Sequence, residues 1–208
     1  MPDVFVDVGM TLDGFIAGTN RSPHNPMGGS APTIHTWLIK VHAWRERQSL
    51  EGGEQNQDNE IANETFERAG AYIMGRRMFD EGELAWPDPP PFQKPVFVLT
   101  NHQREPWERQ GGTTFYFVTG GIEHALELAT EAADGKDVHI SGGGNTIQQF
   151  LNAGLVNELQ IHLAPALLGD GLRLFEHLDT SRFSLELART IESSEVTHLR
   201  YTVSRNSN

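Results

Sequence analysis

The sequence predicts an α/β protein with three layers, in which helices cover a mainly parallel central sheet that ends in antiparallel strands near the C-terminus. Two observations support this fold class. Up to about residue 152, short apolar runs alternate with segments whose apolar residues recur every three or four positions, the order of strand–helix units in a parallel sheet. From residue 158 onward, runs of alternating apolar and polar residues follow one another without such a segment, as in antiparallel strands.

Five short apolar runs are the expected parallel strands. The first, residues 4–8, is interrupted only by Asp7, so we expect it to be buried on both faces of the sheet. The other four are residues 71–74, 96–100, 114–118 and 137–140. Alternating patterns predict three further strands, the last two as an antiparallel hairpin, over residues 158–163, 183–187 and 199–203.

The helices are expected between these strands, where apolar residues share one face at helical spacing. Residues 34–47 predict one continuous helix, whose apolar face consists of Ile34, Trp37, Leu38, Val41 and Trp44. Shorter helices are expected over residues 60–68, 75–79, 122–129 and 146–151.

Two stretches in the N-terminal part are expected to be irregular. Residues 19–32 are rich in Pro, Gly, Asn and Ser, which favour turns. Residues 48–59 are polar and have no aliphatic side chain after Leu50, so we expect them to be mobile. In a single domain over residues 1–208, the region 19–59 is then a polar insertion, and its loops are candidate lids over a site.

The composition excludes several classes of function. The chain has 16 Lys and Arg residues against 28 Asp and Glu residues, a net charge of −12, which argues against nucleic acid and anionic membranes as partners. It contains no Cys, which excludes disulfides, thiolate metal sites and Cys nucleophiles. The N-terminal residues lack the regions of a signal peptide and no stretch has transmembrane length, so we expect a cytoplasmic protein.

A glycine run marks the first candidate site. Ser141, Gly142, Gly143, Gly144 and Asn145 lie between a predicted strand and a predicted helix. Unpaired amides and the positive end of the helix dipole favour a phosphate at such a position. A flexible turn explains the glycines equally well, so the run alone does not decide.

Two further strand ends strengthen the phosphate interpretation. Gly75-Arg76-Arg77 follows one predicted strand, and Thr100-Asn101 follows the next. Ligands of open parallel sheets bind beyond the carboxyl ends of the strands, and an Arg there favours NADP over NAD. A single Arg is more often a solvated surface residue. The G-x-G-x-x-G pattern is absent, so any dinucleotide site is of another type.

These segments carry a resemblance to a known family. The sequence resembles the dihydrofolate reductase superfamily, and within it the branch that contains the C-terminal reductase domain of bacterial riboflavin biosynthesis proteins. Six segments match in the family's order, namely MTLDGFIA (10–17), YIMGRRMF (72–79), VLTN (98–101), VHISGGG (138–144), GLVNEL (154–159) and PALLGDG (165–171). The resemblance spans residues 4–203 and is weakest over 19–59.

The resemblance implies an NADPH-dependent reductase. It assigns the cofactor phosphates and the adenosine ribose to Gly75, Arg76, Arg77, Thr100, Asn101, Ser141, Gly142, Gly143, Gly144, Asn145 and Thr146. The segments that flank the nicotinamide correspond to Val8, Gly9, Ile16 and Ala17. Met78 stands where many members have Thr, so a hydroxyl contact to phosphate is absent and the amides are expected to contribute more of the binding.

The expected substrate is a planar small molecule, either pterin-like or similar to a riboflavin precursor. Dihydrofolate reductases bind the pteridine with a carboxylate on the first helix, but residues 34–47 contain no acid before Glu46. This argues against dihydrofolate itself. A sugar phosphate would require basic residues, for which Arg21 is the candidate. Trp37 is a candidate for stacking on the substrate, although its helical spacing favours packing in the core.

Asp13 is the candidate proton donor because it follows the first strand, and a turn aspartate before Gly14 is the alternative. His35 and His42 are seven residues apart and share one helix face, which we expect to be solvated. His139 and His162 lie in predicted strands and are expected to be structural. No metal site is predicted.

Two functional hypotheses remain open from the sequence. The first is an NADPH-dependent reductase, and the second is a non-catalytic module on the same fold that binds a nucleotide or a flavin. The alternating C-terminal strands leave an apolar edge, which together with the resemblance predicts a homodimer.

Overall fold

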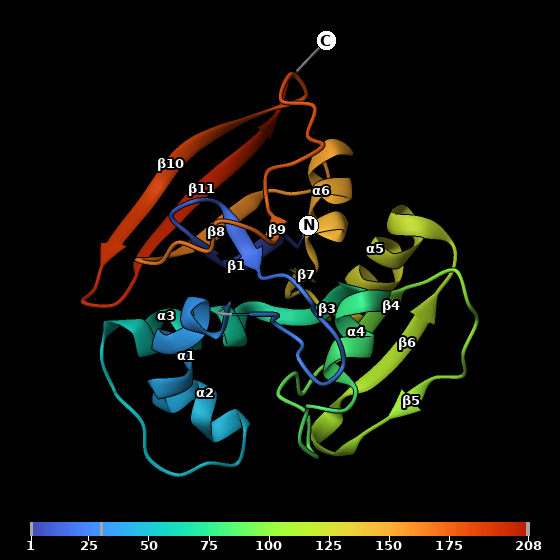
Figure 1. Cartoon of the computed structure of the whole chain (residues 1–208). Helices are drawn as coiled ribbons and strands as arrows, with labels where there is room; N and C mark the ends of the chain where they lie inside the picture. The colour runs from blue at the N-terminus through green and yellow to red at the C-terminus, as the bar shows by residue number, and fades with distance from the viewer. Residues whose placement is uncertain (1, 30, 207–208) are drawn as a thin grey trace.

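The computed structural model describes residues 2–29 and 31–206. Its centre is a nine-stranded sheet with the order β10-β11-β8-β1-β7-β3-β4-β6-β5 (Figure 1). Neighbouring strands run parallel from β8 to β6, whereas β10 and β11 at one edge and β5 at the other are antiparallel to their neighbours. This arrangement confirms the predicted fold class.

All the predicted strands are present, with bounds that differ by a few residues. The five runs expected as parallel strands are β1 (Val4–Thr11), β3 (Ala69–Gly75), β4 (Val96–Leu99), β6 (Thr114–Val118) and β7 (Asp137–Gly142). The three later ones are β8 (Glu158–Ala164), β10 (Phe183–Glu192) and β11 (Thr197–Arg205). A short strand, β5 (Trp107–Glu108), and a 3₁₀ turn, η2 (Gln110–Gly112), were not predicted.

One face of the sheet is apolar and packs against α5 (Gly121–Ala132) and α6 (Gly144–Asn152). Four adjacent strands contribute fully buried side chains to this face, namely Leu159, Val6, Ile140 and Ile73. Removal of these side chains from water is the main force that holds the two layers together. Within the described ranges, no helix is both long and apolar enough to cross a membrane.

The opposite face is polar beneath the N-terminal helices, which Figure 1 shows grouped on the side away from α5 and α6. Successive side chains of a strand point to opposite faces, so Asp7 lies on the face opposite Val6. It is joined there by His162 and Gln160 of β8. The expected burial of residues 4–8 on both faces holds for Val4, Phe5 and Val6, whereas Asp7 and Val8 are partly buried.

The predicted helix over residues 34–47 is divided into η1 (Ala31–His35), α1 (Thr36–Lys40) and α2 (His42–Arg47). Val41 has extended backbone angles, φ −75° and ψ 148°, and a fully buried side chain. Glu54 pairs with the chain at this break: its N–H donates to Lys40 O at 2.9 Å, and its carbonyl accepts from His42 N at 3.0 Å. This strand-like pairing ends α1, and apolar spacing alone does not reveal it.

The polar stretch 48–59 is consequently not a free loop. α3 (Gln57–Arg68) begins before residue 60, because the Asn56 side chain caps it by accepting a hydrogen bond from Asn59 N at 3.0 Å. The Asn59 side chain accepts one from Ala43 N at 2.8 Å, and Asp58 is buried. Side chains whose polarity suggested mobility are therefore hydrogen-bond partners between α2 and α3.

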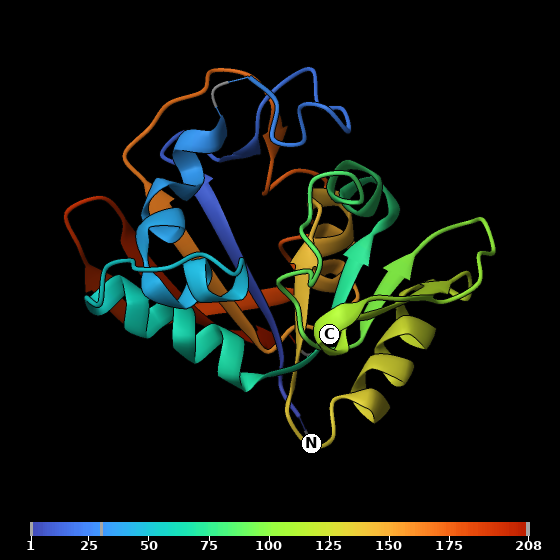
Figure 2. The ribbon, with the colours of Figure 1, turned by 90° about the horizontal axis from the view of Figure 1, so that it is seen from below.

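A second, two-stranded sheet was not predicted. In it, β2 (Phe15–Ala17) pairs antiparallel with β9 (Leu172–Arg173). The pairing joins the loop after β1 to the loop after β8, and Figure 2 shows these two loops together at one end of the molecule. The remaining helix, α4 (Arg76–Gly82), starts directly after β3.

Candidate active site

The parallel strands end at one edge of the sheet, and a cavity lies there, which we call the strand-end cleft. Residues that follow β3, β4, β6 and β7 line it. Because the strands are parallel, residues that are distant in sequence meet at this edge. The predicted cofactor residues that line the strand-end cleft are Gly75, Arg76, Arg77, Thr100, Asn101, Gly143, Gly144, Asn145 and Thr146.

A second cavity, which we call the deep cavity, lies between the sheet and the N-terminal helices. It holds about 1280 Å³ of empty space, with its open mouth included. The remaining predicted cofactor residues line it, namely Val8, Gly9, Ile16, Ala17, Ser141 and Gly142. The two cavities adjoin, because both are lined by Arg21, Met78, Gly143 and Leu172.

The glycines bring backbone close to the border between the cavities. Gly142 has φ +125°, a conformation that favours glycine. A Cβ atom on Gly143 would project into open space, whereas one on Gly75 would lie 2.5 Å from Thr146 Oγ1. Gly75 therefore allows the end of β3 to pack directly against the start of α6. Gly142 and Gly75 therefore require glycine for specific reasons, the first because of its backbone conformation and the second because of its close contact, which weakens the alternative of a flexible turn.

The two arginines that the strand-end cleft takes from α4, Arg76 and Arg77, already have partners within this helix. Arg76 Nε lies 2.6 Å from Asp80 Oδ1, and Arg77 Nε lies 3.0 Å from Glu81 Oε1. These contacts use the Nε groups, so the terminal nitrogens of each guanidinium retain N–H donors for an anion. The arginines are thus oriented by their carboxylate partners as well as available to a ligand.

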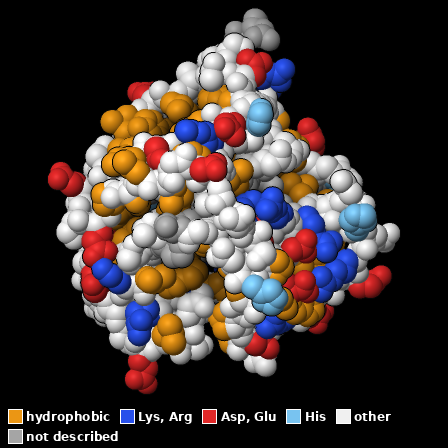
Figure 3. Space-filling view, viewed as in Figure 1, with side chains coloured by type: hydrophobic (Ala, Val, Ile, Leu, Met, Phe, Trp, Pro, Cys, Tyr) orange, Lys and Arg blue, Asp and Glu red, His pale blue; other side chains and the backbone are white. Residues whose placement is uncertain are grey.

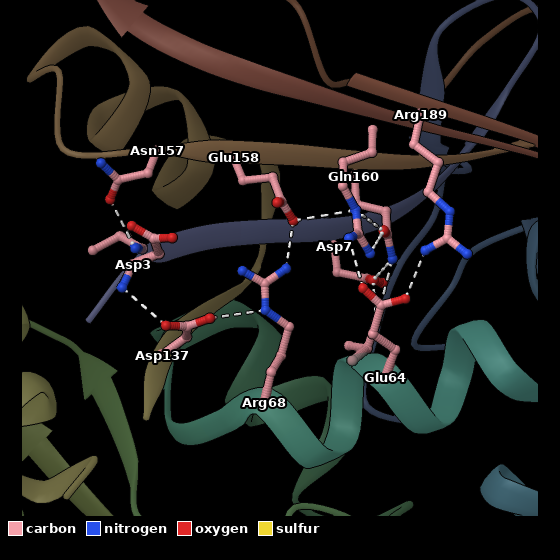
Figure 4. A network of polar contacts seen from close by, with 12 residues as sticks. Asp3, Asp7, Glu64, Arg68, Asp137, Asn157, Glu158, Gln160 and Arg189 are labelled. Atoms are coloured by element: carbon pink, nitrogen blue, oxygen red, sulfur yellow. Dashed lines mark hydrogen bonds and ion pairs between the residues drawn. The ribbon is translucent and has the colours of Figure 1, made fainter. Parts of the chain in front are cut away.

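The deep cavity contains a carboxylate that sequence reasoning missed, Asp7 of β1. Its Oδ2 accepts hydrogen bonds from Thr65 Oγ1 at 2.7 Å and from Gln160 Nε2 at 2.6 Å. Its Oδ1 accepts one from His162 Nε2 at 2.8 Å. Figure 4 shows Asp7 beside Gln160, within a polar network that extends to Glu64 of α3.

Asp7 is ionised in this environment. Burial raises the pKa of its carboxyl, but the charge and hydrogen bond of His162, together with His139 and Thr65, hold that pKa well below its usual range. A carboxylate held by several donors is a strong acceptor for N–H groups. Asp7 therefore gives the deep cavity one end that suits a ligand with N–H donors or a positive charge.

Two neutral histidines share the deep cavity with Asp7. Burial lowers the pKa of His35 and that of His139 to about 4, and the attraction of Asp7 only partly opposes this effect. His35 lines the cavity, so the expectation that it lies on a solvated helix face with His42 is wrong. The two residues belong to different elements because of the break at Val41, and the His42 ring instead contacts Gly52 O at 3.1 Å.

The structure does not place Asp13 at either cavity. Its carboxylate accepts hydrogen bonds from Thr11 Oγ1 at 2.5 Å, from Leu168 N at 3.1 Å and from Gly169 N at 2.8 Å. The hydrogen bond from Thr11 and those from the two amides lower the pKa of the carboxyl. Asp13 thus ties the turn after β1 to the loop after β8, the turn role that was the alternative, and the assignment as proton donor is corrected.

Trp37 lines the deep cavity and also belongs to a small apolar cluster with Val41 and Ala62. Its ring lies 4.6 Å from that of His162 and 4.9 Å from that of His198, measured between centroids. Its buried Nε1 has no hydrogen-bond partner among the described residues. The side chain therefore packs in the core, as its spacing predicted, and also borders the cavity, while its stacking on a substrate stays a prediction.

Comparisons with known proteins agree with this architecture. The family described as RibD C-terminal domain matches residues 2–199. Among solved structures, a protein of Shewanella sp. PV-4 provisionally assigned to riboflavin biosynthesis has 26% sequence identity and a TM-score of 0.66, over 99% of this chain and 100% of that chain.

Two more distant solved structures share the fold. The diaminohydroxyphosphoribosylaminopyrimidine deaminase/5-amino-6-(5-phosphoribosylamino)uracil reductase of Thermotoga maritima is 13% identical, with a TM-score of 0.61 over 97% of this chain and 56% of that chain. Dihydrofolate reductase from Enterococcus faecalis, complexed with NADP(H), is 15% identical, with a TM-score of 0.52 over 98% of this chain and 97% of that chain. At these identities the likeness concerns the fold alone.

Proposed function

The chain belongs to the family of RibD C-terminal domains, and from this premise we propose that it is an NADPH-dependent reductase of a planar small molecule. One observation carries the proposal: the strand-end cleft and the deep cavity adjoin at Gly143. A dinucleotide in the cleft would thereby present one end to a molecule in the deep cavity. When bound, NADPH would supply the hydride.

The strand-end cleft suits the phosphates of such a cofactor. Gly143 and Gly144 offer backbone without side chains at the start of α6, where amides and the helix dipole favour an anion. Arg76 and Arg77 supply positive charge on the opposite wall, after β3. Their pairing with carboxylates fixes their direction and limits their net attraction, so we expect a moderate preference for NADPH over NADH.

The deep cavity suits a flat ring system. Six aromatic side chains line it, namely Trp37, Trp44, Phe66, Tyr72, Trp86 and Phe92. Asp7 and His139 of the sheet and His35 of η1 provide polar groups in its lining. Aromatic walls with a few directed polar groups are typical of sites for planar heterocycles.

Charge in the deep cavity argues against a phosphorylated substrate. Its ionisable lining residues include two carboxylates, Asp7 and Glu81, and one arginine, Arg21. Arg21 is largely buried, and its Nε lies 3.7 Å from Glu81 Oε1. We therefore propose an uncharged or cationic heterocycle with N–H donors, pterin-like or pyrimidine-like, as the substrate class.

Cofactor binding tests the first half of the proposal. Trp37, Trp44 and Trp86 line the deep cavity, so NADPH that reaches Gly143 should quench tryptophan fluorescence and raise the melting temperature, and NADH should do so more weakly. The absence of any response at millimolar NADPH would contradict the proposal of an NADPH-dependent reductase.

The variant Arg76→Ala should weaken NADPH binding about 10-fold, equivalent to ~1.4 kcal/mol, because a charge-assisted contact is lost. Arg182→Ala is the matched control, since Arg182 is also exposed and pairs with a nearby carboxylate, Asp179, but lies outside the cleft. Equal dissociation constants for the two variants would show that Arg76 does not contact the cofactor.

Turnover separates a reductase from a non-catalytic binding module. A panel of pterins, pyrimidines and flavin precursors should include at least one compound that accelerates oxidation of NADPH, followed at 340 nm. Binding of NADPH without turnover of any compound would favour the module. Preference for a phosphoribosylated pyrimidine over its base would contradict the proposed substrate class.

A further inference from the structure

We propose that Asp7, His162, His198 and Asp58 form a buried proton store that supplies the proton needed when a substrate in the deep cavity is reduced. This inference rests on the proposed reductase function and identifies its proton source. Asp7 and His162 line the deep cavity, whereas His198 and Asp58 lie behind them. We call these four residues the Asp-His-His-Asp row.

Three short contacts connect the Asp-His-His-Asp row. Asp7 Oδ1 lies 2.8 Å from His162 Nε2, and His162 Nδ1 lies 2.6 Å from His198 Nδ1. His198 Nε2 lies 3.1 Å from Asp58 Oδ1. The residues come from β1, β8, β11 and α3, so the contacts cross from the middle of the sheet to the helix layer. Trp37 covers both imidazole rings.

The geometry sets the number of protons in the row. A carboxylate oxygen only accepts, so each outer contact requires a proton on a histidine Nε2. The inner contact joins two Nδ1 atoms and also requires one proton between them, because two lone pairs at this distance would repel. Three contacts therefore hold three protons, whereas two neutral imidazoles carry only two. With both carboxylates ionised, the row contains one extra proton and one net negative charge.

The pKa shifts of Asp7 and His198 indicate where the row carries its charges. The lowered pKa of Asp7, which its contact with His162 causes against the effect of burial, keeps Asp7 ionised. Burial first, and then the charge of His162, lower the pKa of His198, while Asp58 opposes both effects. His162 is the imidazole of the row that lines the deep cavity, so its Nε2 proton is the one nearest to a substrate there.

Reduction of a C=N bond adds a hydride to carbon and a proton to nitrogen. We assign the proton to the Asp7–His162 pair: the Nε2–H bond of His162 breaks, its electron pair stays on the ring, and the proton passes through Asp7 Oδ1 to the substrate nitrogen. The row then holds two protons and two negative charges. After the product leaves, one proton from water restores it.

Other ionisable groups surround the row and contribute to the pH at which it loses its proton. On the cavity side they are His35 of η1, His139 of β7 and Tyr72 of β3. On the side of Asp7 Oδ2, which contacts Gln160, the ionisable groups are Arg68 and Glu64 of α3, Glu158 of β8 and Arg200 of β11. None of the described contacts joins any of these groups to Nδ1 of His162 or of His198, so the proton between those atoms is a specific signal of the row.

NMR of the protein with ¹⁵N-labelled histidine tests the proton count without any substrate. We expect one strongly deshielded N–H proton that couples to two Nδ1 atoms and disappears as the pH rises. His198→Phe should abolish it, and His124→Gln, at an exposed histidine of α5, should not. Asp58→Asn keeps the size of the side chain but removes one anion, so the proton should be lost about one pH unit lower.

Kinetics tests the use of the proton. With a substrate found in the panel, turnover should fall above the pH at which the NMR signal is lost, and Asp58→Asn should move that fall by the same amount while NADPH affinity stays unchanged. An absent N–H signal would overturn the store, and coincident pH profiles of the two proteins would overturn its role in reduction. A protein that does not bind NADPH would contradict the reductase proposal, and the NMR titration would still decide the proton count.

Discussion

His139 is a buried polar side chain whose stability depends on remaining neutral. Its ring stacks on Phe5 with 4.7 Å between centroids and 8° between planes, and Tyr72 tilts against it at 5.2 Å. Among the described residues neither of its buried nitrogens has a hydrogen-bond partner of good geometry. Since burial lowers its pKa to about 4, the unfolded chain takes up a proton near pH 6.5 that the folded chain does not.

His139→Leu should therefore make folding less sensitive to acid. A histidine whose pKa is lowered on folding leaves stability unaffected above about pH 6.5 and reduces it progressively down to about pH 4. Removal of the imidazole should raise the free energy of unfolding at pH 5, relative to pH 7.5, by about 1–2 kcal/mol compared with the unmodified protein. Urea denaturation at the two pH values measures this difference.

His124→Leu is the control for that measurement, because the His124 side chain is 52% exposed on α5. It should show the same stability difference from the unmodified protein at both pH values. If His139→Leu follows the unmodified protein at both pH values as well, His139 does not carry the acid sensitivity.

The contrast between Asp7 and Asp13 shows how far sequence reasoning reaches at single positions. Asp13 lies in a matched family segment, but backbone amides of a distant loop donate hydrogen bonds to its carboxylate. Asp7 was the one polar residue in an apolar strand, and on a strand buried on both faces such a residue must have buried partners. That signal was available, whereas the identity of the partners depends on the pairing of β1 with β8 and β7.

The packing of β3 against the start of α6 joins the two parts of the strand-end cleft. Gly75 closes β3 and Thr146 lies in the first turn of α6, where it is buried. A Cβ atom at Gly75 would lie 2.5 Å from Thr146 Oγ1 and 3.8 Å from Thr146 Cβ. Only the hydroxyl therefore obstructs a larger residue at Gly75.

Gly75→Ala should destabilise the protein by about 1–3 kcal/mol through this collision and should also weaken NADPH, because α6 would be displaced. The double variant Gly75→Ala/Thr146→Ala removes the obstructing oxygen and should recover most of the lost stability. Thermal melts of the two single variants and the double variant form a cycle. Additive losses in that cycle would show that the two elements are not coupled through this contact.

The interrupted helix over residues 34–47 shows which property the spacing of apolar residues does not predict, namely the conformation of the backbone. The apolar positions Ile34, Trp37 and Val41 are buried as their spacing indicates. The chain nevertheless leaves helical geometry at Val41, because Glu54 satisfies the backbone of Lys40 and His42 there. Spacing thus predicted which side chains are buried, and a contact between distant residues decided the backbone between them. His35 and His42 consequently belong to different elements, and His35 lines the deep cavity.

The whole molecule carries exposed apolar side chains at one edge of the sheet. Within the described residues β10 pairs only with β11, and its Leu185 and Leu187 are 43% and 56% exposed. Figure 3 shows hydrophobic side chains gathered on the side of the molecule where β10 lies. An edge strand of ten residues is a template for pairing with another chain. The predicted homodimer therefore has a candidate interface along β10.

Leu187→Glu should convert a homodimer of this kind into a monomer, because it places a charge in the interface of a chain that already carries −12. Sedimentation velocity should show a dimer for the unmodified protein and a monomer for the variant, with unchanged circular dichroism. Leu84→Glu is the control, since Leu84 is 68% exposed and follows α4, which packs on β3 and β4 far from the β10 edge. A monomer for the unmodified protein would contradict the homodimer, and a dimer that survives Leu187→Glu would move the interface away from β10.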